Sequence, residues 1–178
     1  ILPASSFQPQ KARYLVEPYI PRGAVTIIGG ISGTGKTSLA LSIAAAISSG
    51  RTLPFETAGT QREPESIVYL TMENDPNVVL RPRLELMGAN LDRCFLLGGA
   101  GTSMTSAELR DAIREVKAAM VVFDPVQSFL PAGTQMGRAE QIRPIVDKVT
   151  DVAKCEDLGS VFVSHMSKPG VGVVSALD

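Results

Sequence analysis

Gly30-Ile-Ser-Gly-Thr-Gly-Lys-Thr37 is the stretch that decides the fold of this chain. It satisfies every fixed position of the phosphate-binding loop pattern G-x-x-x-x-G-K-S/T. In that pattern the glycines let backbone N–H groups close on phosphate oxygens, and the N-terminus of the following helix favours an anion. The alternative is a chance glycine-rich turn. Because an apolar run precedes the stretch and a helical segment follows it, the context favours a nucleotide phosphate site.

The side chains and backbone groups of this loop have separate expected roles. Lys36 is expected to reach the β- and γ-phosphates, and the hydroxyl of Thr37 is expected to ligate Mg²⁺. The residues expected to contact the nucleotide are Gly30, Ser32, Gly33, Thr34, Gly35, Lys36, Thr37 and Ser38.

Apolar runs that predict strands alternate along the chain with segments that predict helices. The expected strands are 24–28, 66–71, 93–97, 119–124 and 160–164. The expected helices are 36–49, 77–87, 109–116 and 138–157. This alternation predicts a three-layer α/β fold, with a mainly parallel β-sheet flanked by helices. Right-handed crossovers would place the carboxyl ends of the strands at one edge, where ligands bind in such folds.

Two of the helices carry more detailed expectations. The run Thr105-Ser-Ala-Glu108 resembles a capping box with Thr105 as its first residue,. In the helix 138–157, Pro144 is expected to kink the helix or to mark its first turn. The residues expected to face inward from this helix are Ile142, Val146, Val149 and Ala153.

The composition is that of one ordinary globular domain. The chain has 178 residues, 44% of them apolar and 20% charged, with a net charge of −1 that gives no overall signal for nucleic acid binding,. Cys94 and Cys155 lack metal-ligand spacing and are expected to be reduced, which favours a cytoplasmic location,. No apolar run approaches the length of a transmembrane helix, so no membrane partner is expected.

Two parts are expected along the chain. Residues 1–23 predict an extended segment at the edge of the domain, because Pro9, Pro18 and Pro21 oppose a helix,. Residues 24–178 are expected to form the core. Since the first residue is Ile rather than Met, we expect the chain to be a piece of a longer protein.

Asp124 ends the apolar run 121–123, directly after an expected strand. In phosphate-loop proteins a carboxylate at this position holds the hydration shell of Mg²⁺ opposite the loop hydroxyl, here that of Thr37. The alternative role for Asp124 is to cap the turn that follows it. The sequence therefore predicts a metal site formed by Thr37 and Asp124.

Glu73 directly follows the expected strand 66–71 and is the candidate general base,. Many ATPases carry a second acid after the metal-binding Asp, but Pro125 occupies that position here. Glu73 is therefore expected to orient and deprotonate the attacking water. Asp75 lies just before Pro76 and is instead expected to cap the next helix,.

His165 is the only histidine of the chain, and it ends the last expected strand. A single histidine is often structural, but its place at a strand end beside the expected γ-phosphate favours a hydrogen bond that senses this phosphate. The catalytic residues are thus expected to be Lys36, Glu73 and His165. Lys168 is either a second phosphate-facing cation or a solvated loop lysine, and the sequence does not separate these roles.

These residues together resemble the RecA-like P-loop ATPases, and most closely the RepA-type hexameric replicative helicase branch of the AAA_25 family. The matching stretches are 14–23, 28–37 with the alanine-rich helix that follows, 69–75, 121–125 and 165–168. The resemblance implies a RecA-like fold in which the strand 160–164 lies between the strands 24–28 and 119–124. It also implies binding of ATP and Mg²⁺, and a Glu73 that activates water.

The resemblance further implies partners. ATP would be hydrolysed at the subunit interfaces of a ring-like homo-oligomer, a hexamer, and His165 would couple the γ-phosphate to loops that contact single-stranded DNA. Those loops would be about 131–138 and 168–175, with Arg138 and Lys168 as their cations. The family carries an arginine finger beyond this point. No candidate follows Lys168, so we expect the core to be incomplete at its C-terminus.

The function expected from the sequence is Mg²⁺-dependent ATP hydrolysis that drives DNA unwinding or translocation. One alternative is a P-loop kinase for a small molecule, with Arg81-Pro-Arg83 as the candidate for its basic lid. The other is a non-hydrolysing nucleotide switch of the KaiC- or RadA-like kind, in which substitution of Glu73 would have little effect.

Overall fold

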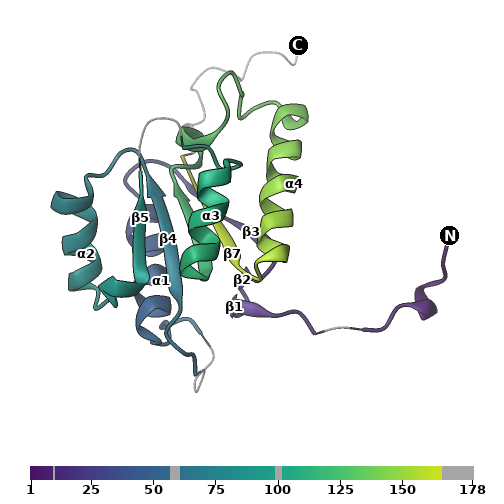
Figure 1. The fold of residues 1–178 in the computed structure, drawn as a ribbon, viewed down its shortest axis with the longest axis horizontal. Helices are drawn as coiled ribbons and strands as arrows, with labels where there is room; N and C mark the ends of the chain where they lie inside the picture. Colours follow the sequence, from purple (N-terminus) through teal and green to yellow (C-terminus); the bar gives the residue numbers. More distant parts are fainter. Residues whose placement is uncertain (10, 57–60, 99–101, 166–178) are drawn as a thin grey trace, which may run out of the picture.

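The computed structural model describes residues 1–9, 11–56, 61–98 and 102–165. Its centre is a five-stranded sheet in the order β3-β7-β6-β4-β5, and every neighbouring pair is parallel (Figure 1). The strands are β3 (Ala24–Gly30), β4 (Ser66–Thr71), β5 (Cys94–Leu97), β6 (Ala118–Asp124) and β7 (Gly159–His165). The placement of β7 between β3 and β6 is the strand order that the resemblance implied. All five strands end at the same edge of the sheet.

Helices cover both faces of this sheet, which confirms the expected three-layer α/β fold. Figure 1 shows α3 and α4 in front of the sheet and α1 behind it. The α-helices are α1 (Lys36–Ser49), α2 (Arg81–Leu86), α3 (Ala107–Val116) and α4 (Ala139–Cys155). The shorter helical turns are η1 (Ala4–Ser6), η2 (Pro76–Leu80), η3 (Leu91–Arg93) and η4 (Val126–Phe129). Among the described helices, none combines the length and apolar character needed to cross a bilayer.

Alternate residues of the central strands pack into two separate cores. In β4, Ile67 and Tyr69 belong to the cluster around α1, whereas Val68 and Leu70 belong to the cluster formed with α3 and α4. In β6, residues 120 and 122 likewise face α1, and residues 121 and 123 face the other helices. Since both faces are buried, these strands are continuous apolar runs in the sequence.

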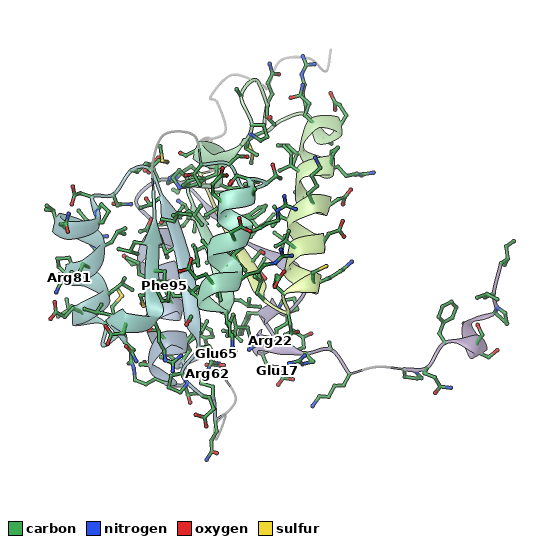
Figure 2. All side chains as sticks on the ribbon, in the orientation of Figure 1. Glu17, Arg22, Arg62, Glu65, Arg81 and Phe95 are labelled. Atoms are coloured by element: carbon green, nitrogen blue, oxygen red, sulfur yellow. The ribbon has the colours of Figure 1, made fainter. Side chains whose placement is uncertain are left out.

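The N-terminal part contains a small antiparallel hairpin formed by β1 (Tyr14–Val16) and β2 (Ile20–Pro21). Its buried side chains join the cluster around α1. Arg22 follows the hairpin and donates two hydrogen bonds to the carboxylate of Glu65, at 2.6 and 2.7 Å. Figure 2 shows these two residues together below the sheet, at the end opposite to the carboxyl ends of the strands. Residues 1–9 are exposed and lead away from the sheet (Figure 1).

Gly159 begins β7 where the hairpin packs against the sheet. A Cβ atom at this position would lie 2.7 Å from Cγ2 of Ile20 and 3.4 Å from Cδ2 of Leu15, and both of these side chains are buried. Overpacking of this kind costs about 1–3 kcal/mol. We therefore expect Gly159→Ala to lower the free energy of unfolding by about 2 kcal/mol in urea denaturation.

Gly137→Ala is the matched control, because a Cβ atom at Gly137 would meet no atom within 4 Å. Its effect is expected to stay within about 0.5 kcal/mol. Equal stability of the two variants would contradict the close contact between the hairpin and β7.

The structure corrects three local expectations. The cap of α3 is Ser106 rather than Thr105, because the hydroxyl of Ser106 accepts from the backbone N–H of Leu109 at 3.2 Å. The expected helix 77–87 is instead the π-helical turn η2 followed by α2.

The helix α4 also differs from its expectation. Pro144 lies inside the helix rather than in its first turn, and the buried residues are Ile145, Val149 and Ala153. Of the other residues expected to face inward, Ile142 and Val146 are half-buried, and Val146 packs against the cluster formed with α3 and α4, as expected.

Candidate active site

The polar residues at the carboxyl edge of the sheet share the face that α1 covers. Val122 in β6 and Val163 in β7 both pack into the cluster around α1. Side chains alternate along a strand, so Asp124 and His165, each two residues further on, point to that same face. The helix α1 begins with Lys36 on this side. The alternation of the strands therefore brings the predicted acid, histidine and loop lysine to one region.

The loop between β3 and α1 depends on two glycines with left-handed backbone conformations. Gly33 and Gly35 have φ angles of +81° and +82°, which residues other than glycine rarely adopt,. At Gly30, a Cβ atom would lie 3.1 Å from Oγ1 of Thr34, so the loop folds closely over the end of β3. Ser32 and Ser38 are exposed, as are the loop residues between Ser32 and Lys36. The loop is therefore open to a ligand.

Lys36 lies against this loop rather than in solvent. Lys36 is 7% exposed, and its Nζ donates to the carbonyl oxygen of Ile31 at 2.7 Å. The hydroxyl of Thr34 donates to the same oxygen at 2.9 Å. The ammonium group is thus held at the loop, where the motif expects phosphate oxygens.

Asp124 is buried, with 1% of the residue exposed. The hydroxyl of Tyr69 donates to its Oδ2 at 2.6 Å. The residue before η4 is Pro125, which makes no side-chain capping hydrogen bond, and the carboxylate of Asp124 is bonded to the neighbouring strand instead. Burial raises the pKa of Tyr69 well above its ordinary value, and the charge of Asp124 and the hydrogen bond to it raise this pKa further. The phenol therefore stays protonated and remains a donor.

The turn that carries Glu73 is held by the end of β4. Oγ1 of the buried Thr71 accepts from the backbone N–H of Glu73 at 3.3 Å and from that of Asn74 at 3.4 Å. Asp75 caps the next helical turn, as expected, because its Oδ1 accepts from the backbone N–H groups of Asn77 and Val78 at 2.8 and 2.9 Å. The two acids therefore differ in role: the carboxylate of Asp75 is used locally, whereas that of Glu73 extends toward β7.

Glu73 and His165 meet at the carboxyl edge of the sheet. Oε2 of Glu73 lies 3.7 Å from Nε2 of His165, and the two side chains are 56% and 38% exposed. Glu73 lies in the turn after β4 and His165 ends β7, and these two strands are separated by β6. A carboxylate that is close to an imidazole and accessible to solvent can accept a proton from water and hold the water in place.

Gln127 connects the turn after Asp124 to the end of β7. Its Nε2 donates to Oγ of Ser164 at 3.2 Å and to the carbonyl oxygen of His165 at 3.4 Å. Its Oε1 is buried without a hydrogen-bond partner. The backbone that carries His165 is thus tied to the segment that carries Asp124.

The donor chemistry of the site fits Mg²⁺. The Thr37 hydroxyl at the start of α1 and the Asp124 carboxylate are hard oxygen donors on the same side of the sheet. The described part of the chain holds no group of three or more His, Cys, Asp and Glu side chains suited to a metal. Mg²⁺ is commonly bound by one or two protein oxygens together with phosphates and waters. When bound here, it would neutralise charge on the β- and γ-phosphates.

The structure thus places the predicted loop, Asp124, Glu73 and His165 around one edge of the sheet, and Lys168 lies outside the described residues. Sequence reasoning missed three supporting residues, namely Tyr69, Thr71 and Gln127. For Thr71, the signal was a threonine hydroxyl two residues before the proposed base. This spacing is typical of ST turns, in which the hydroxyl bonds to the backbone two residues further on. For Tyr69 and Gln127 the partners lie on other strands, so no local pattern indicated them.

A parallel sheet with a phosphate loop after its edge strand β3, a carboxylate at the end of β6 and an acid after β4 defines a RecA-like P-loop ATPase. The chain matches the AAA_25 family, whose description is AAA domain, over residues 3–171. Because this match spans most of the chain, the protein belongs to that family.

Curated relatives are more distant. The DNA repair protein RadA of Streptococcus pyogenes serotype M6 is 24% identical over 151 residues, which cover 83% of this chain and 29% of that protein. RadA of Bacillus subtilis is 23% identical over 153 residues, covering 85% of this chain and 30% of the relative. RadA of Campylobacter jejuni is 21% identical over 150 residues, with 83% and 30% covered. The chain therefore spans less than a third of the length of these relatives.

Proposed function

We propose that this chain binds Mg²⁺ and ATP and hydrolyses the γ-phosphate bond with a water molecule that Glu73 activates. The loop 30–38 would hold the phosphates, Lys36 would neutralise the β- and γ-phosphates, and Thr37 and Asp124 would hold the cation. His165 would hydrogen-bond to the γ-phosphate or to the water between it and Glu73.

The observation that carries this proposal is the contact between Glu73 and His165 at the edge where the loop ends. In the register of the sheet, Gly30 of β3 lies beside His165 of β7. The glutamate–histidine pair is therefore next to the start of the loop rather than elsewhere on the edge. A general base must reach the water directly, and this position provides that access.

We further propose that hydrolysis drives movement on single-stranded DNA by a ring of copies, as in a replicative helicase. The support for a DNA partner is that the compared relatives are named DNA repair proteins. The support for an oligomer is the family resemblance, in which the neighbouring subunit completes the site. Arg138 is exposed at the start of α4 and would be a DNA contact, although its Nε donates to Oε1 of Gln135 at 2.8 Å.

The kinase alternative receives less support from the arrangement of its candidate lid. Arg81 and Arg83 belong to the helix α2. Figure 2 shows Arg81 on the side of the molecule formed by α2, away from the sheet. A lid over the phosphates would have to lie at the carboxyl edge instead.

The test is steady-state ATP hydrolysis at a series of protein concentrations, with and without single-stranded DNA. The proposal predicts that turnover per chain rises with concentration and rises again with DNA. ATP binding without turnover under every condition would contradict hydrolysis and favour the nucleotide switch. Phosphate transfer to an added small-molecule acceptor would favour the kinase.

A further inference from the structure

Tyr69 and Asp124 form a contact between neighbouring strands that the proposed reaction does not yet use. In the register of the sheet, Tyr69 of β4 lies beside Val122 of β6. Asp124 is two residues further along β6 and points to the same face, so the phenol reaches diagonally across to it. The O–H···O distance of 2.6 Å falls in the range of hydrogen bonds to a charged acceptor,.

This contact selects one orientation of the carboxylate. A carboxylate at the end of a strand can rotate about its last side-chain bond, a torsion with broad preferences. A donor fixed on the neighbouring strand restricts that rotation, because Tyr69 is itself fully buried at 0% exposure. One oxygen of Asp124 is then occupied by the phenol, which leaves its second oxygen for another ligand.

We propose that Tyr69 is a positioning residue that orients Asp124 toward Mg²⁺. The inference rests on the proposed function, since it assigns Asp124 to the cation. Residues that hydrogen-bond to metal ligands typically contribute about 10–100-fold to metal affinity or activity. The hydroxyl of Tyr69 makes such a hydrogen bond to Asp124, whereas the ring packs in the core around α1.

A purely structural role for Tyr69 makes a different prediction. The ring packs in the cluster that faces α1, and a phenylalanine ring would fill nearly the same space. If only packing mattered, Tyr69→Phe would leave the response to Mg²⁺ unchanged. The substitution therefore separates the hydroxyl from the ring.

The experiment is a Mg²⁺ titration of ATP binding, measured by calorimetry with purified protein and ATP. Tyr69→Phe is expected to raise the half-saturating Mg²⁺ concentration by about tenfold, while ATP binding in EDTA stays as in the wild type. Tyr14→Phe is the matched control, because it removes the same hydroxyl from the distant hairpin. In an Asp124→Asn background, Tyr69→Phe is expected to add no further change.

A second measurement covers the case in which Tyr69→Phe does not fold. The chain has three tyrosines, so fluorotyrosine labelling of otherwise unchanged protein gives three ¹⁹F resonances. Tyr14→Phe and Tyr19→Phe assign the resonance of Tyr69 by elimination. We expect this resonance to shift when Mg²⁺ is added to the ATP-bound protein, and to stay in place when ATP is added in EDTA.

The proposal would be overturned if folded Tyr69→Phe had the half-saturating Mg²⁺ concentration of the wild type. It would also be overturned if the Tyr69 resonance did not shift when Mg²⁺ is added to the ATP-bound protein. The failure of the proposed function would look different. In that case the wild-type protein itself would not bind ATP, or Mg²⁺ would not affect its binding.

Discussion

Glu73→Gln is expected to lower ATP turnover by about 10²–10⁴-fold while ATP binding remains intact. Glutamine has nearly the same shape as glutamate but cannot accept the proton of the attacking water. Oε2 of Glu73 lies 3.7 Å from Nε2 of His165, and its side chain is accessible to solvent, so its removal does not disturb the core. Single-turnover phosphate release and an ATP-binding titration measure the two effects separately.

Asp75→Asn is the matched control for this substitution. It removes a charge two residues away, but asparagine is as good an N-cap as aspartate. The hydrogen bonds from the backbone N–H groups of Asn77 and Val78 would persist. Turnover is therefore expected to be unchanged. If Asp75→Asn abolished turnover and Glu73→Gln did not, the general base would be Asp75.

Lys36→Ala is expected to weaken ATP binding by about two to three orders of magnitude, because a buried charge pair with phosphate is worth several kcal/mol. The ammonium group of Lys36 lies against the loop at the carbonyl of Ile31. Within the sequence 30–38, Lys36 is the one cationic residue, so its removal takes away the positive charge of the loop. Binding of ATP can be measured by calorimetry in the presence of Mg²⁺.

Lys148→Ala provides the control, because it removes the same charge from an exposed position on α4. Its ATP affinity is expected to equal that of the wild type. If Lys36→Ala and Lys148→Ala bound ATP equally well, the loop 30–37 would not be the phosphate site.

The elements that could be predicted from the sequence are those with strong local causes. The loop needs glycine at Gly33 and Gly35 because of their left-handed backbone, so its pattern is visible without any structure. The bounds of α1 and β4 were also predicted, since glycine ends α1 and the polar segment 61–65 precedes β4. The role of Asp75 as a cap was predicted for the same reason, because its partners are local. Its side chain accepts from the backbone N–H groups of Asn77 and Val78, which directly follow Pro76.

The parts that could not be predicted depend on contacts between distant segments. The inner face of α4 includes Ile145, because the side of a helix that packs on a sheet depends on their crossing geometry as well as on apolar spacing. Thr105 and Ser106 are both good caps, and only the path of the chain into α3 decides between them. The partner of Asp124 is Tyr69, which requires the register of β4 against β6.

The most direct test of this account is a crystal structure of the Glu73→Gln protein with ATP and Mg²⁺. The account predicts that the γ-phosphate lies between Lys36 and the pair formed by position 73 and His165. It also predicts that Mg²⁺ lies on the side of Thr37 and Asp124. A nucleotide bound away from the loop 30–38, or a γ-phosphate remote from position 73, would contradict the account.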